Sequence, residues 1–228
     1  MANILCLDFD DTVIRNNLTR ALFETFAEDG WQEDEARYQR GELSVEQFNM
    51  AAFDRIDADV PREALVEFAR ATAQPREGLI ELWDWATWHG WQVAIVSNGF
   101  DVAIDPVLDE LGLTRVPRHY GRTAKTYRWR VRYLSPRGIE VQSGFKVSYA
   151  QAFRSAGDFV AYVGDGASDV DAAMLARRVL ARSTLLERMT GKVPAPYPFE
   201  TFHDIIAVLN REAETWLKSF LSTTAGEG

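Results

Sequence analysis

The sequence predicts an α/β fold built on a parallel sheet, and two observations lead to this prediction. Apolar runs occupy residues 4–7, 93–96 and 159–163, and each is followed by polar or acidic side chains. A continuous apolar run of this length is typical of a strand that is buried on both faces of a sheet. Residues 79–89 repeat apolar side chains at helical spacing, and Gly90 ends this helix before the next strand. The alternation of helix and buried strand indicates a parallel sheet.

The first apolar run ends in a cluster of acids. Asp8, Asp10 and Asp11 follow residues 4–7 directly, and Thr12 comes next. Ligands and catalytic groups of open α/β sheets lie at the carboxyl ends of the strands. Carboxylates as close as Asp8 and Asp10 repel each other unless a cation or a proton intervenes, and such oxygen ligands suit Mg²⁺. The alternative interpretation is an acidic turn after a strand, since Asp is common in turns.

The bulk composition is that of a globular protein. The 228 residues include 46% hydrophobic and 26% charged residues, and the net charge is -9. This charge argues against a nucleic-acid or membrane-surface binder, although it permits a small anionic substrate. The single cysteine, Cys6, excludes an internal disulfide, and the first residues lack the basic region and apolar core of a signal peptide. We therefore expect a cytoplasmic protein.

The segment 16–74 differs from the rest of the chain because it contains no strand-like run. Apolar residues recur at helical spacing in residues 21–26. Ser44 can cap a helix together with Gln47, three residues further on. Pro61 lies at an expected first helical position. The segment therefore predicts several helices packed as a small bundle.

A basic, β-rich stretch follows the second apolar run. Residues 126–134 alternate in places, and residues 135–138 predict a hairpin turn. The stretch is interpreted either as an anion-attracting rim or contact surface, or as a solvated hairpin that balances acidic neighbours. We favour the second interpretation, because charged faces are usually just exposed. Its basic residues are Arg118, Arg122, Lys125, Arg128, Arg130, Arg132 and Arg137.

The last third of the chain continues the α/β alternation. Lys146 leads into a helix at 147–155, and the strand at 159–163 precedes Asp165 and Asp169. Further on, the sequence predicts a short strand at 179–181, an irregular connection marked by Pro194, Pro196 and Pro198, a closing helix at 205–220 and a frayed end at 222–228.

Four of these features resemble the signatures of the haloacid dehalogenase-like phosphatases, in the order found in that family. Residues 8–12 read Asp-Phe-Asp-Asp-Thr after an apolar strand, and the second strand ends at Ser97. Lys146 stands in Gly-Phe-Lys, and residues 164–169 read Gly-Asp-Gly-Ala-Ser-Asp after another apolar strand. Four matches in order are far more specific than any one of them.

The resemblance implies a particular arrangement of domains. Residues 1–15 and 75–228 would form a Rossmann-like parallel sheet core with helices on both faces. Residues 16–74 resemble the small helical cap that some family members insert after the first signature. Such a cap would close over the site, exclude water and choose the substrate.

The resemblance also implies the chemistry of a phosphatase that forms an aspartyl-phosphate. Asp8 would attack the phosphorus, and Asp10 would protonate the leaving alcohol and then activate water. A bound Mg²⁺ would neutralise the charge of the phosphate. Its ligands would be Asp8, the backbone carbonyl of Asp10, Asp165, and Asp169 either as a ligand or as a residue that holds the ligands in place. The phosphate-binding residues would be Thr12, which also orients its loop, Ser97, Asn98 and Lys146.

The helical insertion and the last signature look most like the phosphoserine phosphatase-like branch. Residues 181–186 and 198–204 are also similar to the methionine-salvage phosphatases, which act on a methylthio-ketopentenyl phosphate. Phosphoserine phosphatases hold the substrate amine with a glutamate and its carboxylate with an arginine, and these positions align with Asn17 and Ala52 here. This difference argues against phosphoserine as the substrate.

We therefore expect the partner to be a small cytosolic phosphomonoester, with no nucleic acid and no membrane. One alternative is a phosphotransferase that passes the phosphoryl group to an acceptor alcohol. Another, from a different class, is a catalytically silent binding protein, and the complete set of acidic, serine and lysine signatures argues against it.

Overall fold

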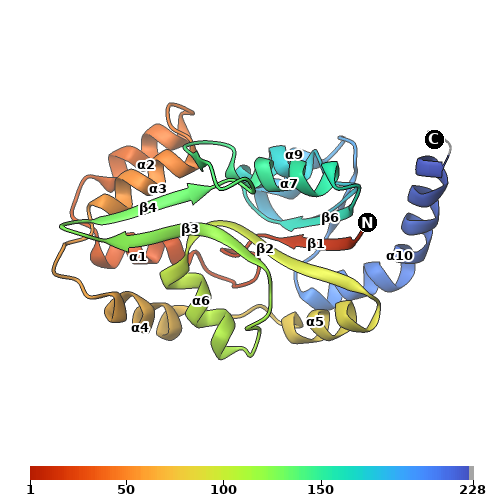
Figure 1. Ribbon diagram of the computed structural model, residues 1–228, viewed down its shortest axis with the longest axis horizontal. Helices are drawn as coiled ribbons and strands as arrows, with labels where there is room; N and C mark the ends of the chain where they lie inside the picture. Colours follow the sequence, from red (N-terminus) through yellow and green to blue (C-terminus); the bar gives the residue numbers. More distant parts are fainter. Residues whose placement is uncertain (226–228) are drawn as a thin grey trace.

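One sheet of eight strands runs through the protein, whose structure is a computed structural model that describes residues 1–225 (Figure 1). The strand order is β5-β4-β3-β2-β1-β6-β7-β8. All pairs from β3 across to β8 are parallel, whereas β4 pairs antiparallel with β3 and with β5. The strands are β1 (Asn3–Leu7), β2 (Trp91–Phe100), β3 (Arg118–Lys125), β4 (Trp129–Leu134), β5 (Glu140–Val141), β6 (Phe159–Gly164), β7 (Arg178–Ala181) and β8 (Pro196–Pro198).

The first strand lies at the centre of the sheet, between β2 and β6. Asn3 pairs with Trp91 on one side and with Phe159 on the other. Leu5 and Leu7 are fully buried, as expected for a strand covered on both faces. The backbone N–H of Asp8 still donates to the carbonyl of Val163, so the acidic cluster begins where the central strand ends. The predicted parallel α/β fold is confirmed.

Helices cover both faces of the central strands. In Figure 1, α5, α6 and α10 lie on one side of these strands, and α7 and α9 lie on the other. The indole Nε1 of Trp85 on α5 donates to Asn210 on α10 at 2.7 Å, which joins two helices of the same layer. These helices are α5 (Leu79–Trp88), α6 (Asp101–Glu110), α7 (Phe145–Ser155), α8 (Val170–Ala173), α9 (Ser183–Met189) and α10 (Phe202–Ala225), and a 3₁₀ turn (Ala167–Asp169) precedes α8.

Residues 16–74, which we call the cap segment, form four helices between β1 and α5. They are α1 (Leu18–Phe26), α2 (Trp31–Gln39), α3 (Val45–Asp54) and α4 (Arg62–Thr72). The predicted capping box at the start of α3 is confirmed, because Gln47 N donates to Ser44 Oγ and Ser44 N donates to the Gln47 side chain. Pro61 caps α4 in an extended conformation and is not its first helical residue. The division into a core and a separate cap domain stays a prediction.

The hairpin of β3 and β4 lies beside the cap segment. The ring of Trp129 packs edge-on against Phe53, with 5.7 Å between ring centroids, and its Nε1 donates to the carbonyl of Val60. Arg130 pairs with Asp54 at 2.6 Å. In the same basic stretch, Arg118 pairs with two carboxylates of α6. Two arginines of the basic stretch thus balance acidic neighbours, as the favoured interpretation expects.

Two predictions for the C-terminal part are wrong. The connection expected to be irregular contains β8, because Pro196 and Pro198 pair with β7. Proline is compatible with this position, since an edge strand needs hydrogen-bond donors on one side only. The frayed end expected at 222–228 is helical as far as Ala225, and residues 226–228 lie outside the described residues. Among the described helices, none is both long and apolar enough to cross a membrane.

The packing of the hairpin on the cap segment predicts a stability effect. Trp129 is 1% exposed, whereas Trp88 is 86% exposed. We expect Trp129→Ala to lower the free energy of unfolding by about 3 to 5 kcal/mol, because it removes a buried aromatic ring and leaves a cavity. Trp88→Ala serves as the matched control and should change it by less than about 0.5 kcal/mol. Urea unfolding of both variants tests this, and equal losses would contradict the packing described here.

Candidate active site

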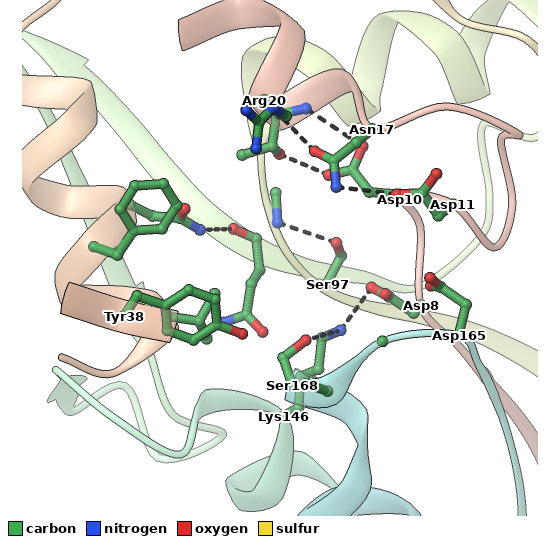
Figure 2. A pocket seen from close by; sticks show the side chains of 18 of the residues that line it. Asp8, Asp10, Asp11, Asn17, Arg20, Tyr38, Ser97, Lys146, Asp165 and Ser168 are labelled. Carbon is green, nitrogen blue, oxygen red and sulfur yellow. Dashed lines mark hydrogen bonds and ion pairs between the residues drawn. The ribbon is translucent and has the colours of Figure 1, made fainter. Parts of the chain in front are cut away.

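Lys146 lies between two carboxylates at the carboxyl ends of the central strands, and Figure 2 shows its contact with Asp8. Its Nζ is 2.8 Å from Oδ1 of Asp8, which follows β1, and 2.7 Å from Oδ1 of Asp169, which follows β6. Burial alone would lower the pKa of Lys146, but the two carboxylates outweigh it and raise that pKa. Burial and the charge of Asp169 raise the pKa of Asp8, and Lys146 opposes this rise. The lysine is therefore a fixed positive charge in a buried acidic site.

Asp169 is held by four donors. Its Oδ1 accepts hydrogen bonds from Lys146 and from the hydroxyl of Tyr162 at 2.6 Å. Its Oδ2 accepts from the backbone N–H groups of Asp165 and Gly166, at 3.2 and 2.9 Å. A Cβ at Gly164 would lie 2.8 Å from the Asp169 carboxylate, so this close approach needs a glycine. Asp169 is fully buried and does not line the cavity described below.

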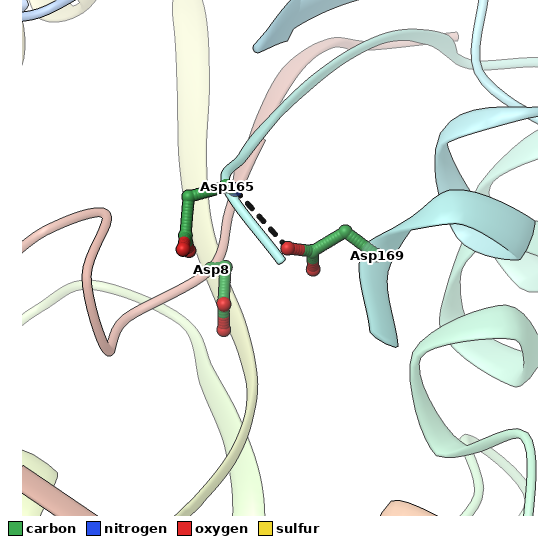
Figure 3. Close-up of side chains that lie close together, drawn as sticks. All are labelled: Asp8, Asp165 and Asp169. Carbon is green, nitrogen blue, oxygen red and sulfur yellow. Dashed lines mark hydrogen bonds between the residues drawn. The ribbon is translucent and has the colours of Figure 1, made fainter. Parts of the chain in front are cut away.

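Three carboxylates of the acidic cluster form a candidate cation site. Asp8, Asp165 and Asp169 each offer an oxygen, and these atoms all lie within 4.8 Å of one another (Figure 3). Burial and the charge of Asp169 raise the pKa of Asp165 to about 7, while the hydroxyl of Thr12, which donates to Asp165 Oδ1 at 3.0 Å, lowers it. One lysine does not balance these carboxylates, and their oxygens suit a hard divalent cation such as Mg²⁺. The residues present therefore fit the predicted metal.

Asp10 occupies a different environment from Asp8. Its Oδ1 accepts from the N–H of Leu18 at 2.8 Å, and its Oδ2 accepts from the hydroxyl of Thr19 at 2.6 Å. Burial raises the pKa of Asp10 to about 6, against the lowering effect of these hydrogen bonds. A carboxyl group with a pKa near neutrality can both give and take a proton at physiological pH.

A cavity of about 230 Å³ opens in front of these groups (Figure 2). Asp8, Asp10 and Lys146 line its floor on the sheet side, together with residues 97–99 near the end of β2 and with Asp165. Side chains of the cap segment line the opposite wall. They are Asn17, Thr19, Arg20, Phe23, Glu35, Tyr38, Val45, Phe48 and Asn49.

The structure brings together most of the residues that the sequence predicts for the site. Ser97 and Asn98 line the cavity, and Ser97 Oγ accepts from the N–H of Gly99 at 3.0 Å. The side-chain amide of Asn98 donates to Glu46, so it is engaged away from the cavity. Thr12 is fully buried and does not line the cavity. Its bond to Asp165 supports the loop-orienting role rather than phosphate contact.

Several site residues were not predicted from the sequence. Tyr162, which holds Asp169, lies inside an apolar strand, where a tyrosine gives no sign of a polar partner. Tyr38, Arg20 and Glu35 line the cavity from α1 and α2, and only the fold determines which faces of these helices meet it. The helical spacing of Phe23 indicated burial but did not indicate a cavity wall.

The fold and the geometry thus define an α/β protein with a carboxylate-rich site at the carboxyl ends of its central strands. The chain matches the haloacid dehalogenase-like hydrolase family over residues 5–174, and it belongs to this family.

Two sets of known proteins are similar to it. A 2-hydroxy-3-keto-5-methylthiopentenyl-1-phosphate phosphatase of Bacillus mycoides is 26% identical over 214 residues, which cover 92% of this chain and 97% of the relative. One of Bacillus thuringiensis subsp. konkukian is 26% identical over 219 residues with the same coverage. A phospho-aspartyl intermediate analogue of phosphoserine phosphatase superposes with a TM-score of 0.67 at 20% identity, covering 90% of this chain and 98% of the other. A substrate-bound phosphoserine phosphatase has the same TM-score and identity. Both sets of similar proteins are thus named as phosphatases, and they match almost the whole of this chain.

The acidic cluster predicts that Mg²⁺ stabilises the fold. We expect the melting temperature to rise by about 5 to 10 °C at a Mg²⁺ concentration about 100 times Kd, because only the folded chain assembles the site. Asp165→Asn should remove most of this shift, and Asp84→Asn, an exposed carboxylate on α5, should leave it intact. Differential scanning calorimetry with and without Mg²⁺ measures both, and an undiminished shift in Asp165→Asn would contradict the assignment.

Proposed function

We propose that the protein is a Mg²⁺-dependent phosphomonoester hydrolase that acts on a small metabolite through an aspartyl-phosphate on Asp8. The observation that carries this proposal is the pairing of Asp8 with Lys146 in the floor of a cavity that Asp10 also lines. A nucleophile, a fixed cation and a proton-transfer group thus face one cavity. This is the set that displacement at phosphorus requires.

The reaction would proceed in two displacements. A carboxylate oxygen of Asp8 attacks the phosphorus, the bond to the leaving oxygen breaks, and Asp10 gives its proton to the departing alkoxide. Asp10 then takes a proton from water, whose oxygen attacks the phosphorus, and the bond to Asp8 breaks to release inorganic phosphate. The two carboxylates can take these separate roles because one is ion-paired and the other is held by neutral donors at a pKa of about 6.

Asp8, the backbone carbonyl of Asp10 and Asp165 would hold the Mg²⁺. When bound, this ion neutralises charge on the phosphoryl oxygens and allows an anionic nucleophile to approach an anionic ester. The four hydrogen bonds to Asp169 support a role in holding Lys146 in place rather than in direct ligation. Lys146 and the Ser97 hydroxyl would contact the phosphoryl oxygens.

The cap segment would enclose the leaving group. Four of the nine side chains on its wall of the cavity are aromatic or aliphatic, namely Phe23, Tyr38, Val45 and Phe48, and the Tyr38 ring stacks on Phe48 at 5.8 Å between ring centroids. A wall of this kind favours an apolar arm on the substrate. The helices that carry these side chains would act as the lid predicted from the sequence.

Charge on the same wall is already balanced. Arg20, the cation of the cap wall, pairs with Glu24 at 2.9 Å and with Glu35. Asn17 donates to Asp11, and Ala52 is fully buried away from the cavity. An ammonium or a carboxylate on the leaving group would thus meet no unpaired partner among the described residues of this wall, which argues against phosphoserine.

We therefore propose an uncharged leaving group with an apolar arm. The methylthio-ketopentenyl phosphate named for the curated relatives has this character, because its thioether chain is apolar and its oxygen functions are neutral. It is the first substrate to test.

Substrate hydrolysis is tested with a panel of phosphates that includes this compound, phosphoserine, sugar phosphates and nucleoside monophosphates. We expect Mg²⁺-dependent phosphate release that is strongest with the methylthio-ketopentenyl phosphate and is lost with EDTA. Asp8→Asn should lower kcat by about 1,000-fold or more, because it removes the nucleophile. Asp84→Asn controls for the loss of a carboxylate elsewhere. Undiminished turnover in Asp8→Asn would refute the mechanism, and a preference for phosphoserine would refute the substrate class.

The balanced charge of Arg20 predicts a change of specificity. Glu35→Gln removes one of its two carboxylate partners, which leaves the guanidinium free to attract a carboxylate in the cavity. We expect the kcat/KM ratio for phosphoserine over the methylthio-ketopentenyl phosphate to rise by about three- to tenfold, the effect of a partly screened charge pair. Glu33→Gln, the same change on an exposed position of α2, is the control. An equal kcat/KM ratio in the parent protein, Glu35→Gln and Glu33→Gln would contradict the role assigned to the pair of Arg20 and Glu35.

A further inference from the structure

Glu46 is a buried carboxylate that reaches from the cap segment into the core. It lies in the first turn of α3 and is 2% exposed, and no salt bridge pairs it with a cation among the described residues. Its Oε1 accepts hydrogen bonds from the N–H of Phe145 at 2.8 Å and from the side-chain amide of Asn98 at 3.2 Å. A buried charge is costly unless hydrogen bonds compensate for it, so these two contacts fix where Glu46 can lie.

The first contact caps the helix that carries Lys146. Phe145 is the first residue of α7, and the preceding Gly144 has no side chain with which to cap it. The free N–H groups at a helix N-terminus need acceptors and favour a negative charge. Glu46 supplies both the acceptor and the negative charge from another part of the chain. The N–H that it accepts belongs to Phe145, and Lys146 is the next residue.

The second contact holds residues 97–99 of β2, which line the cavity. Asn98 donates to Glu46 through its side chain, while its carbonyl accepts from Asn49 at 2.8 Å and from the hydroxyl of Tyr133. Asn49 lies three residues after Glu46 and therefore on the same face of α3. Tyr133 belongs to β4 of the hairpin and is fully buried. These residues of β2 are thus held by the cap segment and the hairpin together.

We propose that Glu46 is a positioning residue that holds residues 97–99 of β2 and the start of α7 together, so that phosphate binding depends on the docking of α3 against the core. A single oxygen of Glu46 bonds to both elements, one carrying Ser97 and the other Lys146. Displacement of α3 would release both elements at once. This inference rests on the proposed function, in which these two elements contact the phosphate.

The test is the affinity for inorganic phosphate, measured by isothermal titration calorimetry of the full chain in Mg²⁺. Glu46→Gln keeps the shape but removes the charge, and we expect Kd to rise about tenfold, as for the loss of a charge-assisted hydrogen bond. Tyr133→Phe removes one donor to the Asn98 carbonyl outside the cavity wall, and we expect a rise of about threefold, as for a neutral hydrogen bond. Melting temperatures are recorded for every variant.

The matched control is Asp34→Asn. Asp34 is another buried carboxylate of the cap segment, 7% exposed, but its partners Arg37 and Arg55 belong to the cap segment itself. The Asp34→Asn variant should lose stability and keep the phosphate affinity of the parent protein. This separates positioning from a general loss of stability.

The outcomes are distinct. Unchanged Kd in Glu46→Gln overturns the inference, and so does an equal rise in Kd in Asp34→Asn. If Glu46→Gln does not fold, Tyr133→Phe decides in the same way, and unchanged affinity in that variant overturns the inference. Failure of the parent protein to bind phosphate overturns the proposed function and the inference together, whereas binding by the parent protein with no change in the variants overturns the inference alone.

Discussion

The site depends on a single ammonium group shared between two buried carboxylates. Lys146 contacts both Asp8 and Asp169, and Asp165 lies close enough for its charge to act on the same group of atoms. In a medium of low polarity, this repulsion among carboxylates would oppose folding unless cations and hydrogen-bond donors surround them. The sheet places the carboxylates, and the first turn of α7 places the ammonium between them. The glycine at 164 and the tyrosine at 162 are present because Asp169 must be held where the lysine can reach it.

The two walls of the cavity have different roles in the proposed reaction. The sheet side gathers charge at the ends of β1 and β6, and its side chains are fixed by backbone N–H groups and buried hydrogen bonds. The cap side presents aromatic rings and an arginine paired with carboxylates, together with the polar side chains of Asn17, Thr19 and Asn49. Groups that perform the reaction are thus fixed in rigid elements, while groups that would face the leaving group belong to a separate set of helices. This arrangement allows the substrate to change without altering the reacting atoms.

The fold and the acidic site residues could be predicted from the sequence because both produce local sequence patterns. An apolar run followed by Asp marks the end of a buried strand, and Ser44 with Gln47 marks a helix start. The rest depends on contacts between distant parts of the chain. Glu46 is a residue type usually found at the surface, and its burial follows from a helix N-terminus 99 residues further along the sequence. The strand at Pro196–Pro198 escaped notice because proline disfavours strands except at an edge, and edge positions are known only once the sheet order is known.

The strands at both edges of the sheet are short, and this has a consequence for how the protein behaves in a crowded solution. One end is β5, with two residues, and the other is β8, with three residues of which the first and last are prolines. A proline offers no N–H to an approaching strand, and two residues are too few to template one. Within the described residues, neither end presents a long row of unpaired backbone groups. Strand addition onto either of these short edge strands is therefore disfavoured, which limits the edge-to-edge aggregation to which long exposed strands are prone.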